Sequence, residues 1–170
     1  YNPRIYEVGP GKSFAPAETL PASANHAIQN ALDAAATFVG QSNTNSNRGA
    51  LVVVYPNNPS ANPRQNPRGA YYENLIISSK VKLQGVGPGS PDGSVRGSII
   101  DGGAFAGDSP VATDWYTKIG NLTWAGNQTI YDGAVISIYA PAPANGAVGR
   151  RAFPTTYSAN TAPSIDGFDL

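Results

Sequence analysis

The sequence predicts an all-β protein in which short strands stack as the coils of a solenoid behind one capping helix. Only residues 28–39 have the periodicity of a helix of convincing length. The other apolar segments are short and strand-like, with no further helices between them. Two-residue hairpin connections between matched strands are scarce, which disfavours an antiparallel sandwich or barrel. A solenoid leaves an apolar end that an atypical terminal element must cover, and the helical stripe has the shape of that lid.

The predicted helix has apolar residues at i, i+3, i+4, i+7, i+8 and i+11, namely Ile28, Ala31, Leu32, Ala35, Ala36 and Val39. Ser23 or Asn25 is expected to cap its start, and Gly40 is expected to end it in a left-handed conformation. Residues 41–48 contain no apolar side chain, so a solvated loop is expected there. The helix is therefore expected to be isolated and amphipathic.

The strands are predicted from short β-branched or alternating segments. The run 50–55 is continuously apolar, as in a strand buried on both faces. The other predicted strands are 5–8, 74–77, 81–84, 98–100, 134–139 and a segment from 164 onward. Long loops are expected at 56–69, where prolines forbid regular structure, and at 104–132.

Composition limits the classes of function. The 170 residues carry eleven Lys and Arg against eleven Asp and Glu, so a nucleic-acid partner is not expected. There is no cysteine, which excludes disulfide scaffolds and Cys-ligated zinc. No apolar run approaches the ~20 residues that span a bilayer, so no membrane span is expected. The sequence predicts no cofactor and no metal.

The ends of the sequence suggest the front part of a longer chain. The sequence starts at Tyr1 without any Met, and residues 164–170 alternate like a strand that has just begun. The single domain 1–170 is therefore expected to continue past residue 170. Its open end is expected to be covered by the remainder of the same chain or by another subunit, because an exposed last coil would leave strand edges unpaired.

Several ordered segments carry a resemblance to a known family. These are 26–35 (HAIQNALDAA), 51–56 (LVVVYP), 72–77 (YENLII), 81–87 (VKLQGVG) and 99–102 (IIDG). In this order they resemble the opening of right-handed parallel β-helix proteins of the pectin-lyase-like superfamily. The resemblance covers roughly residues 5–103 and implies a capping helix followed by regular coils. The catalytic residues of that superfamily lie on later coils, so none is assigned here.

Two functions follow as expectations. The resemblance implies a secreted, extracellular protein that binds or degrades polysaccharide, with its catalytic residues outside this segment. The alternative is a structural or adhesive protein of the cell surface that assembles with itself, which the low charge and the aromatic loops also suit. Whether the protein is an enzyme stays open.

Three aromatic residues are the candidate contacts for a ligand or partner. Trp115, Tyr116 and Trp124 lie in the excursion 104–132, and exposed aromatic faces stack on sugars and anchor interfaces. The alternative is a loop held against the domain by its own aromatic side chains. Asn121 and Asn127 begin glycosylation sequons.

Acidic residues offer weaker candidates for chemistry. The Asp-Gly pairs at Asp92, Asp101, Asp132 and Asp166 are scattered, which favours turns over a calcium site. Asp101, Asp108 and Asp114 are close in sequence, but this spacing does not establish the carboxylate pair of a glycosidase. The single histidine, His26, has no nucleophile and acid partner in the segment.

Overall fold

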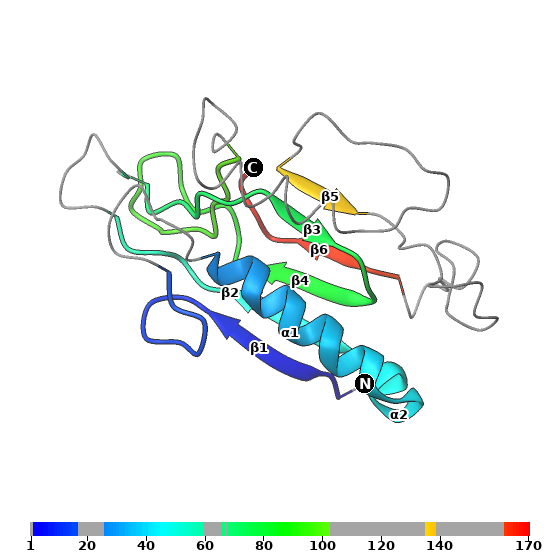
Figure 1. Ribbon diagram of the computed structural model, residues 1–170. Coiled ribbons are helices and arrows are strands. Elements are labelled where there is room, and N and C mark those ends of the chain that lie inside the picture. Colours follow the sequence, from blue (N-terminus) through cyan, green and yellow to red (C-terminus); the bar gives the residue numbers. More distant parts are fainter. Residues whose placement is uncertain (1, 17–25, 60–65, 67, 103–134, 139–161) are drawn as a thin grey trace.

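The computed structural model describes residues 2–16, 26–59, 66, 68–102, 135–138 and 162–170. Within them the chain forms β1 (Arg4–Val8), α1 (Ala27–Gln41), α2 (Asn43–Arg48), β2 (Ala50–Val54), β3 (Leu75–Ile77), β4 (Val81–Gly85), β5 (Ile136–Ile138) and β6 (Ser164–Asp166) (Figure 1). The strands form a four-stranded sheet in the order β1-β2-β4-β6 and a two-stranded sheet, β3-β5. Every strand pair in both sheets is parallel.

Alternation along the strands of the larger sheet places one set of side chains in the core. Ala50, Val52 and Val54 of β2 are fully buried, and the residues between them are only partly buried. The same alternation holds for β4, where Val81 and Leu83 point inward. Inward and outward residues of neighbouring strands are aligned by the register, in which Ala50 is opposite Val81 and Val52 is opposite Leu83. The sheet therefore has a continuous apolar face and a separate outer face.

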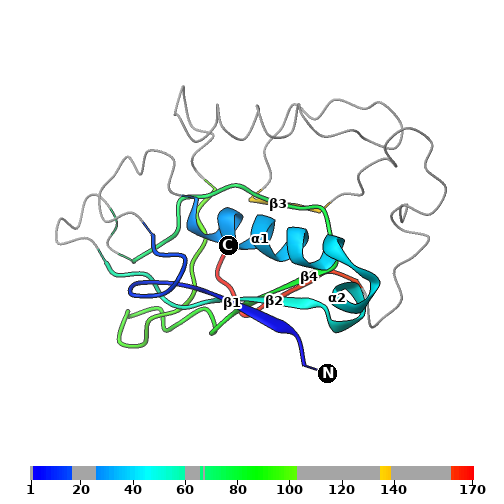
Figure 2. The ribbon, with the colours of Figure 1, turned by 60° about the horizontal axis from the view of Figure 1, so that its bottom comes forward.

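Helix α1 lies between the two sheets. Its buried stripe includes Ile28, Ala31, Leu32, Ala35 and Val39, as the helical periodicity predicts. The helix contacts β1, β2 and β4 of the larger sheet and β3 of the smaller one. Figure 2 shows this arrangement, with β3 on one side of the helix and β1 and β2 on the other. The alanines of the stripe keep the helix close to both sheets because they add little bulk.

The expected all-β fold, a right-handed parallel β-helix solenoid with a capping helix, is wrong. The structure is mixed α/β, with α1 packed against parallel sheets of four and two strands. The prediction treated the helical stripe as a lid over the end of a strand stack. The same apolar surface instead packs against strands of both sheets and forms a layer of the core.

Three local expectations about the helical region also need correction. Residues 43–48, expected as a loop because they lack apolar side chains, form the short helix α2, and the Ser42 side chain accepts a hydrogen bond from the Asn45 backbone N–H. Gly40 does not end α1, which continues to Gln41. The residue before α1 is His26, whose side chain makes no capping hydrogen bond. The expected caps at residues 23 and 25 lie outside the described residues.

Candidate functional site

The outer face of the larger sheet presents side chains from all four of its strands. This face consists of Ile5 and Glu7 of β1, Leu51 and Val53 of β2 with Tyr55 after it, Lys82 and Gln84 of β4, and Ser164 and Asp166 of β6. The opposite residues of the same strands belong to the core, so alternation places this set outside. The β1–β2 half of the outer face is mainly apolar, and the β4–β6 half is entirely polar.

One row of the outer face crosses the sheet from edge to edge. Glu7 is opposite Val53, Val53 is opposite Gln84, and Gln84 is opposite Asp166. Neighbouring strands are spaced by about 4.8 Å. The Gln84 Nε2 donates to the carbonyl oxygen of Gly85 at 2.9 Å and lies 3.4 Å from the Asp166 carboxylate. This row therefore carries a carboxylate on β1, the apolar Val53 on β2, an amide on β4 and a second carboxylate on β6.

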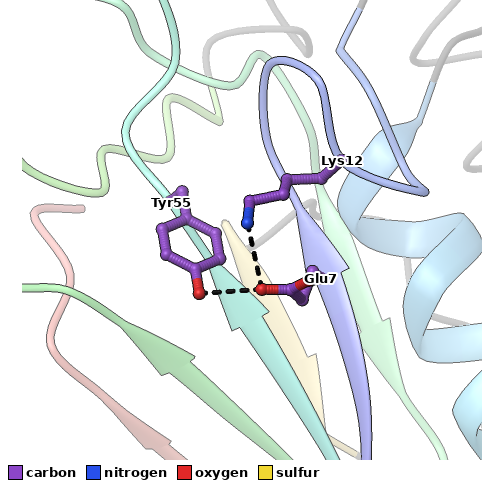
Figure 3. Close-up of polar contacts among 3 residues, drawn as sticks. All are labelled: Glu7, Lys12 and Tyr55. Atoms are coloured by element: carbon purple, nitrogen blue, oxygen red, sulfur yellow. Dashed lines mark hydrogen bonds and ion pairs between the residues drawn. The ribbon is translucent and has the colours of Figure 1, made fainter.

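At one end of this row Glu7, Lys12 and Tyr55 form a polar group, here called the Glu7 cluster (Figure 3). The Glu7 Oε1 accepts a hydrogen bond from the Tyr55 hydroxyl at 2.8 Å and one from the Lys12 ammonium at 3.1 Å. The ammonium nitrogen also lies 4.3 Å from the centre of the Tyr55 ring, where a cation–π contact adds to the ion pair. The cluster thus joins β1, the turn that follows it and the end of β2.

The Glu7 cluster holds the segment 9–14 against the outer edge of β1. Phe14 pairs with Val8 in a parallel bridge, its N–H donating to the Glu7 carbonyl and its carbonyl accepting from the Gly9 N–H. The Phe14 ring lies 6.2 Å from the Tyr6 ring. The C-terminal half of this edge strand is therefore covered, which reduces its capacity to pair with another strand.

Electrostatics disfavours acid–base catalysis by Glu7 and Tyr55. The hydrogen bond from Tyr55, followed by the one from Lys12, lowers the pKa of Glu7 below 4.5. The hydrogen bond to Glu7 and its negative charge raise the pKa of Tyr55 above 10. A general acid or base works best with a pKa near the working pH, and both shifts move away from neutrality. At neutral pH the cluster is a fixed carboxylate–phenol–ammonium arrangement.

Behind the outer face, a buried carboxylate that the sequence analysis did not single out anchors α1. The two carboxylate oxygens of Glu73 accept the backbone N–H groups of Ile28 and Gln29 at 3.0 and 2.9 Å. Burial, and then the negative charge of Glu73, raises the pKa of Tyr71. The Tyr71 hydroxyl donates to the Tyr55 carbonyl oxygen at 2.7 Å, so the buried region and the Glu7 cluster share one residue. The only signal in the sequence was the order Tyr-Glu-Asn before a strand.

Trp115, Tyr116, Trp124 and the glycosylation sequons at Asn121 and Asn127 lie outside the described residues. Among the described residues, no group of three or more His, Asp or Glu side chains could hold a metal ion.

Asp92 stabilises a turn. Its carboxylate accepts hydrogen bonds from the Ser90 hydroxyl and from the backbone N–H and hydroxyl of Ser94, and these bonds, that of Ser90 first, lower the pKa of Asp92 to about 2. The Asp-Gly pair at Asp92 thus lies in a turn.

Comparison of the chain with protein families, curated proteins and solved structures found no match. In the part of the chain that the structure describes, neither helix has the length and apolar character needed to cross a lipid bilayer.

Proposed function

We propose that this protein is an extracellular polysaccharide-binding protein and that the polar part of the outer face is its binding surface. The observation that carries the proposal is the row Glu7–Val53–Gln84–Asp166, which crosses all four strands of the larger sheet. Carboxylate and amide side chains match the hydroxyl groups of a sugar chain as hydrogen-bond partners. The segments that resemble the pectin-lyase-like superfamily imply the same class of ligand, although the solenoid that the resemblance also implies is not the fold observed.

Tyr55 adds a second element to this surface. Its ring lies at the end of the row, with the Lys12 ammonium 4.3 Å from the ring centre. Aromatic rings contact the apolar faces of sugars, while neighbouring polar groups bind the hydroxyls. A polysaccharide lying across the strands would contact Gln84 and Asp166 over β4 and β6. It would reach the Tyr55 ring beside β1 and β2.

Binding to immobilised xylan, dextran and polygalacturonate tests this proposal. Gln84→Ala and Asp166→Ala are each expected to weaken binding to the recognised polymer by up to about tenfold, the effect of one lost hydrogen bond. Asn47→Ala is the matched control, because Asn47 is an exposed amide on α2, away from the outer face. Equal binding by all three variants and the unmodified protein, or binding to none of the polymers, would reject the outer face as this surface.

A second candidate function is self-assembly at the cell surface, and the exposure of Ile5 favours it. Ile5 is 58% exposed on the edge strand β1, next to the partly buried Leu51. An apolar side chain on an edge strand promotes pairing between chains. Sedimentation velocity of the unmodified protein and Ile5→Ser distinguishes the two functions. Assembly that Ile5→Ser abolishes, without loss of polysaccharide binding, supports this second candidate.

A further inference from the structure

Two arginine side chains lie against the same aromatic ring at the amino-terminal end of β1. The guanidinium carbon of Arg4 lies 5.0 Å from the centre of the Phe38 ring, and that of Arg48 lies 5.9 Å from it. Arg4 also lies 5.5 Å from the centre of the Tyr6 ring. Three segments meet here, because Arg4 begins β1, Phe38 belongs to the last turn of α1 and Arg48 ends α2.

The aromatic ring fixes the position of both charges. Phe38 is only 7% exposed and belongs to the apolar core, whereas Arg4 and Arg48 are exposed. The π face of an aromatic ring attracts a guanidinium group within about 6 Å of its centre. The Nε of Arg48 also donates to the Asn2 carbonyl oxygen at 2.9 Å. Arg48 is thus held at two points.

No acidic side chain compensates this charge in the described part of the chain. There, neither Arg4 nor Arg48 makes an ion pair, although Lys12 pairs with Glu7. Arg68 likewise pairs with Asp169. Two like charges near one ring repel each other, and an anion between or beside them relieves that repulsion.

We infer that Arg4 and Arg48, held by Phe38, form a binding site for an oxyanion, meaning a sulfate, phosphate or carboxylate group. The planar guanidinium fork presents paired N–H donors that match the oxygens of these groups. The aromatic contacts pre-organise the donors, which lowers the entropy lost on binding. The site lies at the amino-terminal end of β1, whereas the Glu7 cluster lies toward its carboxyl end, and it does not depend on polysaccharide binding at the outer face.

Nuclear magnetic resonance of the full 170-residue chain tests the site directly. Sodium sulfate, titrated at constant ionic strength against sodium chloride, is expected to shift the side-chain Nε–Hε signals of Arg4 and Arg48 in a saturable manner. The Arg96 signal serves as the internal control, because Arg96 is exposed but donates to Asn58 on a different loop. Equal shifts at all three arginines, or no saturable shift, would overturn the proposal.

Variants then separate the charge from the geometry. Arg48→Gln is expected to weaken sulfate binding at least about tenfold, as the loss of a charge-assisted hydrogen bond does. Arg48→Lys is expected to weaken binding less, because it retains the charge without the fork, and Arg96→Gln is expected to have no effect. If Arg96→Gln weakened sulfate binding as much as Arg48→Gln does, the loss would depend on net charge alone. That result would reject the site.

A comparison of polymers identifies the source of the oxyanion. Dextran sulfate and uncharged dextran are applied to the unmodified protein and to Arg48→Gln. Binding of inorganic sulfate and dextran sulfate with similar affinity per sulfate indicates a site for a free ion. Much tighter binding of dextran sulfate, lost in Arg48→Gln, indicates a site for an anionic group on a chain. Failure of the outer-face variants to alter this binding distinguishes the site from the proposed polysaccharide surface.

Discussion

Glu73 and Glu7 each use one carboxylate to join segments far apart in the sequence, but their surroundings differ. Glu73 is 4% exposed and accepts two backbone N–H groups from the first turn of α1. The Glu7 side chain is 41% exposed and accepts hydrogen bonds from Lys12 and Tyr55. The hydrogen bonds named here differ in the access of water to their donors, because the Glu73 carboxylate is buried and the Glu7 carboxylate is partly exposed.

Burial determines how much each carboxylate contributes to the free energy of unfolding. If Glu73 is removed, the N–H groups of Ile28 and Gln29 stay inside the protein without their acceptor, at the positive end of the α1 dipole. If Glu7 is changed, water can reach Lys12 and Tyr55 in its place. A carboxylate that accepts two hydrogen bonds therefore stabilises the fold strongly in the core and weakly at the edge of the sheet.

The largest effect is expected from Glu73→Ala. We expect it to lower the free energy of unfolding by about 3 kcal/mol, because two charge-assisted hydrogen bonds are lost and two N–H groups remain buried. Urea denaturation at pH 7 measures this. Glu73→Gln is the control, with an intermediate loss, since its side-chain oxygen still accepts one hydrogen bond. A loss below about 1 kcal/mol for Glu73→Ala would show that the first turn of α1 is satisfied in another way.

A smaller effect is expected from Gln29→Ala, which removes the second connection between α1 and β3. The Gln29 side chain donates to the Ile76 carbonyl at 3.0 Å and accepts from the Ile76 N–H at 2.7 Å. The loss should be about 2 kcal/mol, and the Ile76 amide should exchange its hydrogen faster. Asn30→Ala, an exposed neighbour on α1, is expected to change stability by no more than about 0.5 kcal/mol. Unchanged exchange at Ile76 would contradict the connection.

Much of the local structure follows from sequence patterns. The apolar stripe of α1 predicts its buried face, and the β-branched run 50–55 predicts β2. The overall class was wrong, because a stripe shows that a helix is buried without showing against what. Here the partners are strands of two sheets. Helix α2 was missed since its residues carry no apolar period, and a cap at Ser42 with packing on α1 supports it instead.

The sites were less predictable than the elements. The helix cap was sought among residues next to α1 in sequence, whereas the structure supplies it from Glu73, 45 residues after Ile28. Capping rules use only residues that are adjacent in sequence. They therefore cannot identify a donor and an acceptor that come together only in the folded chain. The Glu7 cluster could not be predicted for the same reason, because Tyr55 reaches Glu7 only when β1 pairs with β2.

The smallest effect on the free energy of unfolding is expected from Glu7→Gln, and the dependence of this effect on pH makes it measurable. The folded pKa of Glu7 lies below its ordinary value of 4.5, so its contribution to stability is present in full above that pH. The contribution is lost as the pH falls through the lower, folded pKa. The difference in free energy of unfolding between the unmodified protein and Glu7→Gln should therefore shrink from pH 7 to pH 3, and high salt should reduce it at pH 7. A difference that grows as the pH falls would contradict the assignment.

Tyr55→Phe separates the two bonds that lower the pKa of Glu7. The hydrogen bond from the Tyr55 hydroxyl has the larger effect on that pKa, ahead of the one from Lys12. Its removal should raise the pKa of Glu7 toward 4.5, as read from the carboxyl carbon signal in a titration. Lys12→Met removes a hydrogen bond and a charge together, so a larger rise of the Glu7 pKa in that variant would mean that the ion pair dominates the cluster. The exposed carboxylate would then be controlled by charge, while the buried one is controlled by hydrogen bonding to the backbone.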